Sequence, residues 1–416
     1  MNGIKGLEGE FLKGINIHAP ESRDYCLELI HFLRKTPVEW VRIHPLPTRR
    51  LHLKGPSGIS HLDSIEKFAE AGFDLIIPID VGVKENVGVI TVPNLRRFVD
   101  SSYNESFKAV KQIETRISKY NAKVIYGIEN EIDTKEWILQ SMPTVGWRES
   151  SFAWIELSVN KDLKFKRLNH ILEGIKEASP NALTMVNFEA DDPVEDWNTM
   201  MSFMLAGQTV FSKLGLIEKD ARIRMNNYRI DVDEATKRLS FDIIGMDKYP
   251  NYFTKIPPRG TKIGVKANQI AHMTRKPVIN IEFGYTREGR GTKPTSLFRS
   301  PSPQSLASPE EHQRKFFENS LTSIENSVSQ GTFPWVLLLD PARGYKPREE
   351  NGFTLLKIGS NRMLEPTPAL DYYINWLDAI NTRELESQVP IEDRLAKDIG
   401  SIESGLDLSR ESGRSQ

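Results

Sequence analysis

Short apolar, β-branched runs alternate along the chain with longer charged segments whose apolar residues recur three and four positions apart. Parallel strands need a crossover of a dozen or more residues, usually a helix, so this alternation predicts parallel strands joined by helices. The strand-like runs occupy residues 11–17, 39–43, 73–79, 123–128, 182–187, 241–246, 277–281 and 333–339. The helix-like segments occupy residues 23–34, 64–71, 104–120, 164–178, 262–273, 309–329 and 369–380. Eight such units favour a closed (β/α)8 TIM barrel over an open doubly wound sheet.

The connections are uneven, with enlarged loops after predicted strands 4, 5, 7 and 8. We expect extra helices in the second of these loops and a short hairpin in the last. All four follow the carboxyl ends of strands, the face on which barrel enzymes build their active sites. No G-x-G-x-x-G follows the first strand and no G-x-x-x-x-G-K-[ST] occurs, so a nucleotide-binding open sheet has no support.

We expect residues 1–380 to form the barrel domain and residues 381–416 to form a poorly ordered tail. The tail is polar and contains no aromatic residue, so it offers little apolar surface to offset the entropy of ordering.

The composition is that of a globular chain of 416 residues, 39% of them hydrophobic. Lys plus Arg number 55 and Asp plus Glu 56, and this balance argues against binding to nucleic acid or to an anionic membrane through bulk charge. Cys26 is the one cysteine, so an intrachain disulfide is excluded and a reducing compartment fits. The amino terminus lacks the apolar core of a signal peptide, and no run approaches the ~18 apolar residues of a membrane helix. We therefore predict a cytoplasmic protein.

Two predicted strands end in a carboxylate at the mouth of the barrel. The fourth ends in Gly-Ile-Glu-Asn-Glu, with Asn130 directly before Glu131, and the seventh reads Val-Ile-Asn-Ile-Glu-Phe-Gly, with Glu282. A carboxyl pair facing each other across such a mouth is what glycoside hydrolysis needs, because one group protonates the leaving oxygen and the other attacks the anomeric carbon or activates water.

With these motifs the chain resembles clan A of the retaining glycoside hydrolases, whose acid/base and nucleophile lie at the ends of barrel strands 4 and 7. The resemblance covers residues 11 to about 380 and includes further strand ends. Arg42 stands where the clan often has an arginine, and Tyr249 follows an Ile-Gly dipeptide on strand 6, with Asp247 where asparagine is usual. On strand 8 the sequence Gly-Thr-Phe-Pro-Trp-Val-Leu-Leu-Leu-Asp supplies Trp335 and Asp340, one residue longer than the pattern expected.

The resemblance implies a role for each of these residues. Glu282 is the expected nucleophile, and Arg42 and Tyr249 would favour its charged form. Glu131 is the expected acid/base and must begin protonated. Asn130 would bind the sugar 2-hydroxyl, a contact that strengthens in the oxocarbenium-like transition state. Trp335 would stack on the apolar face of the cleaved sugar.

Other mouth residues have weaker assignments. Asp80, His44 and Asp247 are candidate ligands of sugar hydroxyls, and a purely structural role competes with each, as it does for His18. Each of the other three residues also has a structural alternative. Arg42 could bridge a carboxylate inside the barrel, and Tyr249 could pack at the mouth. Trp335 could face the helices, because the side chains of a strand alternate in direction. The loop after strand 4 holds three tryptophans that either line the sugar site or anchor the loop: Trp137, Trp147 and Trp154.

The sequence thus predicts a retaining glycosidase that needs no cofactor or metal and acts on an equatorial, preferably β-linked, bond of short oligosaccharides or glycosides. Its partner is a carbohydrate, with no nucleic acid and no membrane. Two alternatives stay open: a catalytically silent sugar-binding barrel, and a metal-dependent TIM-barrel hydrolase that uses the strand-end His and Asp residues. The second lacks an H-x-H pair on strand 1 and an HExxH motif.

Overall fold

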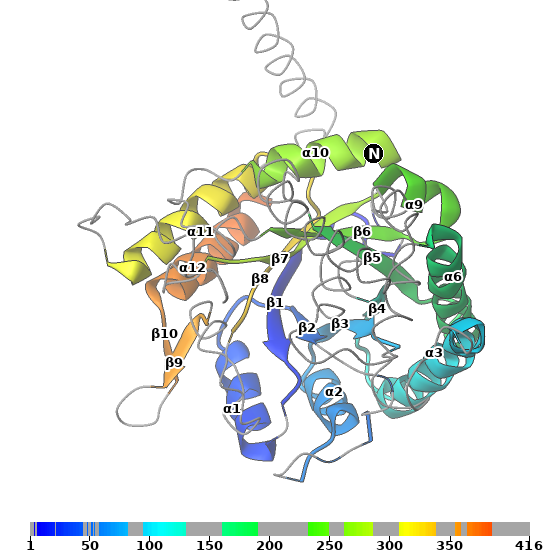
Figure 1. Cartoon of the computed structure of the whole chain (residues 1–416). Coiled ribbons are helices and arrows are strands. Elements are labelled where there is room, and N and C mark those ends of the chain that lie inside the picture. Colours follow the sequence, from blue (N-terminus) through cyan, green and yellow to red (C-terminus); the bar gives the residue numbers. More distant parts are fainter. Residues whose placement is uncertain are drawn as a thin grey trace, which may run out of the picture.

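Eight parallel strands pair in chain order and close into a barrel in the computed structural model (Figure 1). β1 closes the barrel by pairing in parallel with β8, Leu12 opposite Gly331. This architecture confirms the predicted (β/α)8 TIM barrel. The strands are β1 (Leu12–His18), β2 (Trp40–His44), β3 (Asp74–Ile79), β4 (Val124–Ile128), β5 (Leu183–Glu189), β6 (Ile243–Lys248), β7 (Val278–Phe283) and β8 (Gly331–Pro334).

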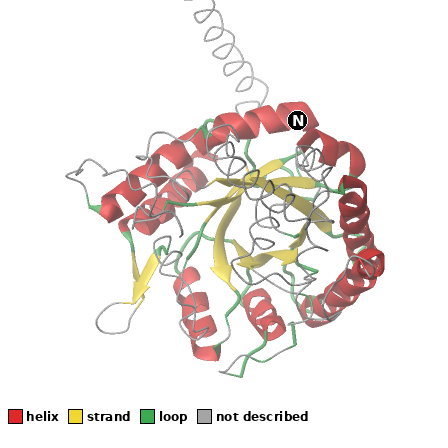
Figure 2. Cartoon of the chain, in the orientation of Figure 1, coloured by secondary structure: helices red, strands yellow, loops and turns green. Residues whose placement is uncertain are grey.

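Helices surround the barrel as an outer ring (Figure 2). Several begin at side chains that bind the free N–H groups of the first turn. Ser60 and Asp63 form a reciprocal capping box at the start of α2, and Ser308 accepts from the backbone N–H of Glu311 at the start of α11. The helices are α1 (Arg23–Leu33), α2 (His61–Glu70), α3 (Leu95–Ile117), α6 (Lys161–Ala178), α9 (Val232–Arg238), α10 (Ile263–Thr274), α11 (Pro309–Glu325) and α12 (Pro368–Glu384).

The structure describes the barrel strands, the ring helices and the adjoining turns. The described residues are 4, 6–20, 22–44, 48, 51–52, 54, 58–81, 95–129, 160–189, 232–248, 262–285, 308–337, 354–358 and 364–384. Within them, no helix is long and apolar enough to cross a membrane.

The main differences from the predicted elements lie at element ends. α3 begins nine residues before the predicted start at residue 104, because its buried positions Leu95, Phe98 and Val99 extend the apolar face at helical spacing. β8 begins two residues earlier than predicted and ends at Pro334, a residue that cannot donate to a strand ladder. α12 extends to Glu384, four residues past the predicted end of the barrel domain, and the division into domain and tail stays a prediction.

Two extra elements lie in the enlarged loops. α9 is a helix between β5 and β6, as expected for that loop. β9 (Leu356–Ile358) and β10 (Leu364–Pro366) pair in antiparallel fashion between β8 and α12, which is the hairpin expected there. Figure 1 shows this hairpin on the outside of the barrel, beside α12.

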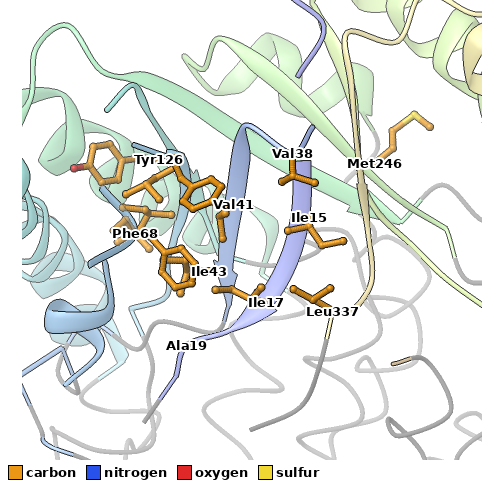
Figure 3. Close-up of a cluster of buried hydrophobic side chains, with 14 of the residues drawn as sticks. Ile15, Ile17, Ala19, Val38, Val41, Ile43, Phe68, Tyr126, Met246 and Leu337 are labelled. Carbon is orange, nitrogen blue, oxygen red and sulfur yellow. The ribbon is translucent and has the colours of Figure 1, made fainter. Parts of the chain in front are cut away.

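Alternate residues of each strand face two separate apolar cores. The larger core fills the space between strands and helices, and Figure 3 shows Ile15, Ile17 and Val41 of β1 and β2 in it. The smaller core fills the barrel and includes Leu12 and Phe333. Gly14 is required where the Phe333 ring crosses β1, because a Cβ at this position would lie 1.9 Å from that ring.

Toward the carboxyl ends of the strands the barrel interior changes from apolar to polar. The buried polar residues on these strands include Asn16, Arg42, Asn187, Asp247 and Glu282. Buried polar groups are costly unless they are paired, so their concentration at this end marks it as the candidate site.

Candidate active site

A bulge in β7 directs Glu282 toward the barrel interior. Ile279 and Ile281 both belong to the interior core, so strict alternation would turn Glu282 outward. The register shifts here against both neighbouring strands: Met246 pairs with Asn280 but Asp247 pairs with Glu282. One extra residue in β7 therefore lets Glu282 follow Ile281 and still face inward, as bulges near active sites do.

The Glu282 carboxylate forms an ion pair with Arg42, whose Nη1 donates to Oε1. Both side chains are almost completely buried, 1% exposed for Arg42 and 4% for Glu282. Arg42 belongs to β2, and β8 and β1 lie between β7 and β2 around the barrel. The ion pair therefore crosses the barrel interior and gives Glu282 a positively charged partner. The arrangement places the predicted nucleophile and its predicted arginine partner together.

Asn16 of β1 joins this pair to the barrel wall. Its Oδ1 accepts from Arg42 Nη1 at 3.0 Å, and its amide nitrogen donates to the carbonyls of Ile281 at 2.7 Å and Phe333 at 2.8 Å. Ile281 precedes Glu282 directly, so one amide fixes both the arginine and the backbone that carries the carboxylate. Sequence reasoning did not single out Asn16, although a polar residue between Ile15 and Ile17 in a buried strand was a usable signal.

Trp335 lies against two histidines at the mouth. Its ring centroid is 5.2 Å from that of His18 and 5.5 Å from that of His44, both in edge-to-face geometry. The alternative in which Trp335 faces the helices is therefore wrong, since its ring meets the ends of β1 and β2. The backbone N–H of Trp335 donates to Phe283 at 2.9 Å, and the peptide bond to Val336 is cis.

Asp247 is completely buried and accepts a hydrogen bond from Asn187 Nδ2 at 2.7 Å. Asp247 also pairs in strand register with Glu282 on the adjoining strand β7. Sequence reasoning also missed Asn187, which, like Asn16, is a single polar residue between apolar neighbours in a buried strand. Asp80 directly follows β3 and is half-buried, and its carbonyl accepts from the backbone N–H of Thr48 at 3.0 Å.

Several predicted site residues lie outside the described residues: Glu131, Asn130, Tyr249, Asp340, Trp137, Trp147 and Trp154. Their assignments stay predictions. The last described residue before Glu131 is Glu129, whose side chain is buried and paired with Arg167 of α6.

In the described part of the chain, no group of three or more His, Cys, Asp and Glu side chains is arranged to hold a metal ion. His18 and His44 stand near each other, with ring centroids 6.5 Å apart, but they contact the Trp335 ring.

No protein-family model and no curated protein sequence matches the chain. Its fold is similar to that of solved glycosidases. An exo-β-1,4-mannosidase from Opitutaceae bacterium strain TAV5 matches with a TM-score of 0.53 and 13% identity over 90% of this chain. A β-glycosidase, BGL167, matches with a TM-score of 0.54 and 10% identity over 89% of this chain and 96% of its own.

The GH53 catalytic domain of Ignisphaera aggregans gives a TM-score of 0.50 and 15% identity over 90% of this chain and 98% of its own. The chain spans 60% of the length of the Opitutaceae mannosidase. These matches, at 10–15% identity, confirm the barrel fold that the alternation of strands and helices predicted.

Proposed function

We propose that the chain is a retaining glycoside hydrolase in which Glu282 is the nucleophile and Glu131 the acid/base. The observation that carries this proposal is the buried Arg42–Glu282 ion pair at the carboxyl end of β7 in a closed eight-stranded barrel. A carboxylate held there by charge and by the Asn16 amide is a preorganised nucleophile, since little reorganisation is needed when it attacks.

In the first step a carboxylate oxygen of Glu282 bonds to the anomeric carbon, and the bond from that carbon to the leaving oxygen breaks. Glu131 gives its proton to that oxygen. In the second step water loses a proton to Glu131 and attacks the same carbon, which frees Glu282 and retains the configuration. Asn130 binds the 2-hydroxyl, Trp335 stacks on the sugar ring, and His44, Asp80 and Tyr249 bind hydroxyls or orient neighbours. No metal or cofactor takes part.

The substrate that we propose is an equatorial, β-linked bond in a short oligosaccharide or glycoside. The similar structures described as an exo-β-1,4-mannosidase and a β-glycosidase support this class. The four enlarged loops after strand ends support a pocket rather than an open cleft. Cytoplasmic residence stays a prediction and is compatible with the single, buried Cys26.

Hydrolysis of a panel of aryl β-glycosides tests the proposal. Glu282→Ala should be nearly inactive on every substrate and should regain turnover with azide or formate, giving a product of inverted configuration. Glu131→Ala should lose most on poor leaving groups and far less on activated ones, which leave without a proton.

The two alternatives give other results. A silent sugar-binding barrel would bind glycosides without turnover, and a metal-dependent hydrolase would lose activity with chelator. Equal sensitivity of the two variants to leaving-group acidity would contradict the retaining mechanism.

A further inference from the structure

Glu129, at the end of β4, has a backbone conformation that is unusual for its residue type. Its φ is 52°, in the left-handed region, which is unfavourable for a residue with a Cβ because the Cβ comes too close to the following carbonyl oxygen. Among the described residues other than glycine, Arg275 shares a positive φ, and it is the left-handed cap at the end of α10, where such a conformation is ordinary. Glu129 instead follows directly after β4 and precedes Asn130 and Glu131. Strained residues of this kind persist only where their surroundings hold them.

Arg167 of α6 supplies the contacts that hold Glu129. The two side chains form an ion pair and are 1% and 4% exposed. Arg167 Nη2 also donates to the carbonyl of Val81, just past β3, at 2.7 Å, and its guanidinium lies over the Phe98 ring of α3 at 5.1 Å. One arginine therefore ties the end of β4 to the end of β3 and to two helices.

The left-handed turn changes the direction in which Glu129 points. Ile125 faces the barrel core, and alternation along β4 would place Glu129 on the same side two pairs later. The carboxylate instead meets the helical layer, while the backbone N–H of Glu129 still donates to Ile79 of β3 at 3.2 Å. The backbone of Glu129 is thus held by β3, and its side chain is held by α6.

We infer that the Glu129–Arg167 pair is a positioning device for the acid/base Glu131. This inference rests on the proposed function. Glu131 is two residues beyond Glu129, so at most about 7 Å of extended chain separates it from the fixed point. Proton transfer depends on a hydrogen-bond distance to the leaving oxygen, and a misplacement of 1 Å can cost roughly 100-fold in rate. Arg167 touches no reacting atom and acts through Glu129.

The test uses Arg167→Met, which removes the charge and keeps an apolar stem, and the double variant Glu129→Gln/Arg167→Met, which leaves no lone buried charge and guards against misfolding. Arg167→Lys keeps the charge but replaces the planar guanidinium, which reaches both Glu129 and the Val81 carbonyl, with a single ammonium group. Lys176→Met is the matched control, because Lys176 lies on the same helix and pairs with Asp242, which precedes β6 at the opposite end of the barrel. Each is assayed with aryl β-glycosides of graded leaving-group acidity.

We expect Arg167→Met and the double variant to lose roughly 100-fold in kcat/KM on the poorest leaving group and much less on a dinitrophenyl glycoside. Arg167→Lys should recover part of this loss, and Lys176→Met should show no dependence on the leaving group. A uniform loss across leaving groups in the Arg167 variants would make the pair structural and overturn the inference, while the proposed function would stand if Glu131→Ala keeps its selective loss. A wild type that hydrolyses no glycoside of the panel would overturn both.

Discussion

Removing Arg42 should destabilise the protein strongly, because it would leave Glu282 as a buried carboxylate without its cation. The Arg42 and Glu282 side chains are 1% and 4% exposed, so solvent cannot replace the lost partner. Breaking such a pair from one side costs about 3–5 kcal/mol. The entropy of unfolding of 416 residues is about 0.9 kcal/mol per degree, so Arg42→Met should lower Tm by about 3–6 °C.

A double-mutant cycle that combines Arg42→Met with Glu282→Gln tests whether the two charges stabilise each other. Glu282→Gln keeps the shape and an acceptor oxygen but removes the negative charge, so adding it to Arg42→Met should raise stability above that of Arg42→Met alone. The free energies of unfolding of the wild type, the two single variants and the double variant are measured by chemical denaturation. They are compared where the dependence on denaturant concentration has the same slope in all four proteins.

Lys13→Met is the control. Its partner Glu39 lies next to the start of β2 and is 56% exposed, so this substitution should cost no more than about 1 kcal/mol. If Glu282→Gln further destabilises the Arg42→Met protein, or if Arg42→Met costs no more than Lys13→Met, then the Arg42–Glu282 pair is not a coupled buried ion pair and the account of the nucleophile is wrong.

Three other outcomes follow from the structure. Trp335→Ala should lower kcat/KM on all substrates, by about tenfold if stacking contributes about 1.4 kcal/mol, and unchanged kinetics with a lower Tm would assign Trp335 to packing. Truncation after Glu384 should leave turnover intact, and failure to fold would show that the tail is a structural element. Burial opposes ionisation of Asp242, but hydrogen bonds from Lys176 and Thr184 outweigh it and hold the pKa of Asp242 below its ordinary value of 3.8. Asp242→Asn should therefore lower Tm at neutral pH. The Tm difference from wild type should vanish as the pH falls below 3.8 and through the lowered pKa of Asp242, because a carboxyl group with a lowered pKa stabilises the folded protein only while it is ionised.

The sequence predicted the barrel because strand and helix periodicities are local properties of the chain. The resemblance to the clan-A hydrolases also implied that Arg42 would lie near Glu282, because the clan often has an arginine at the end of strand 2 and has its nucleophile at the end of strand 7. The sequence could not predict the bulge at Ile281, because Glu282 faces inward through a register shift that only pairing with β6 and β8 reveals.

Two site features escaped prediction for a different reason. Asn16 connects Arg42 to the carbonyl of Ile281, 265 residues away along the chain, and a single polar residue in a strand does not indicate its partner. The sequence does not indicate the contact of Glu129 with α6, because neither the positive φ of Glu129 nor its pairing with Arg167 has a local sequence signature.

Covalent trapping tests the central claim most directly. The wild type should hydrolyse some member of the aryl β-glycoside panel, and a 2-deoxy-2-fluoro dinitrophenyl analogue of that sugar should form the glycosyl-enzyme and release it slowly, because fluorine destabilises the oxocarbenium-like transition state. Mass spectrometry of the digested protein should then place one fluoro-sugar on the peptide that contains Glu282, and Glu282→Gln should acquire none. A label on another carboxylate, or turnover of the parent glycoside with an inverted product and no covalent adduct, would contradict the assignment of Glu282 as the nucleophile.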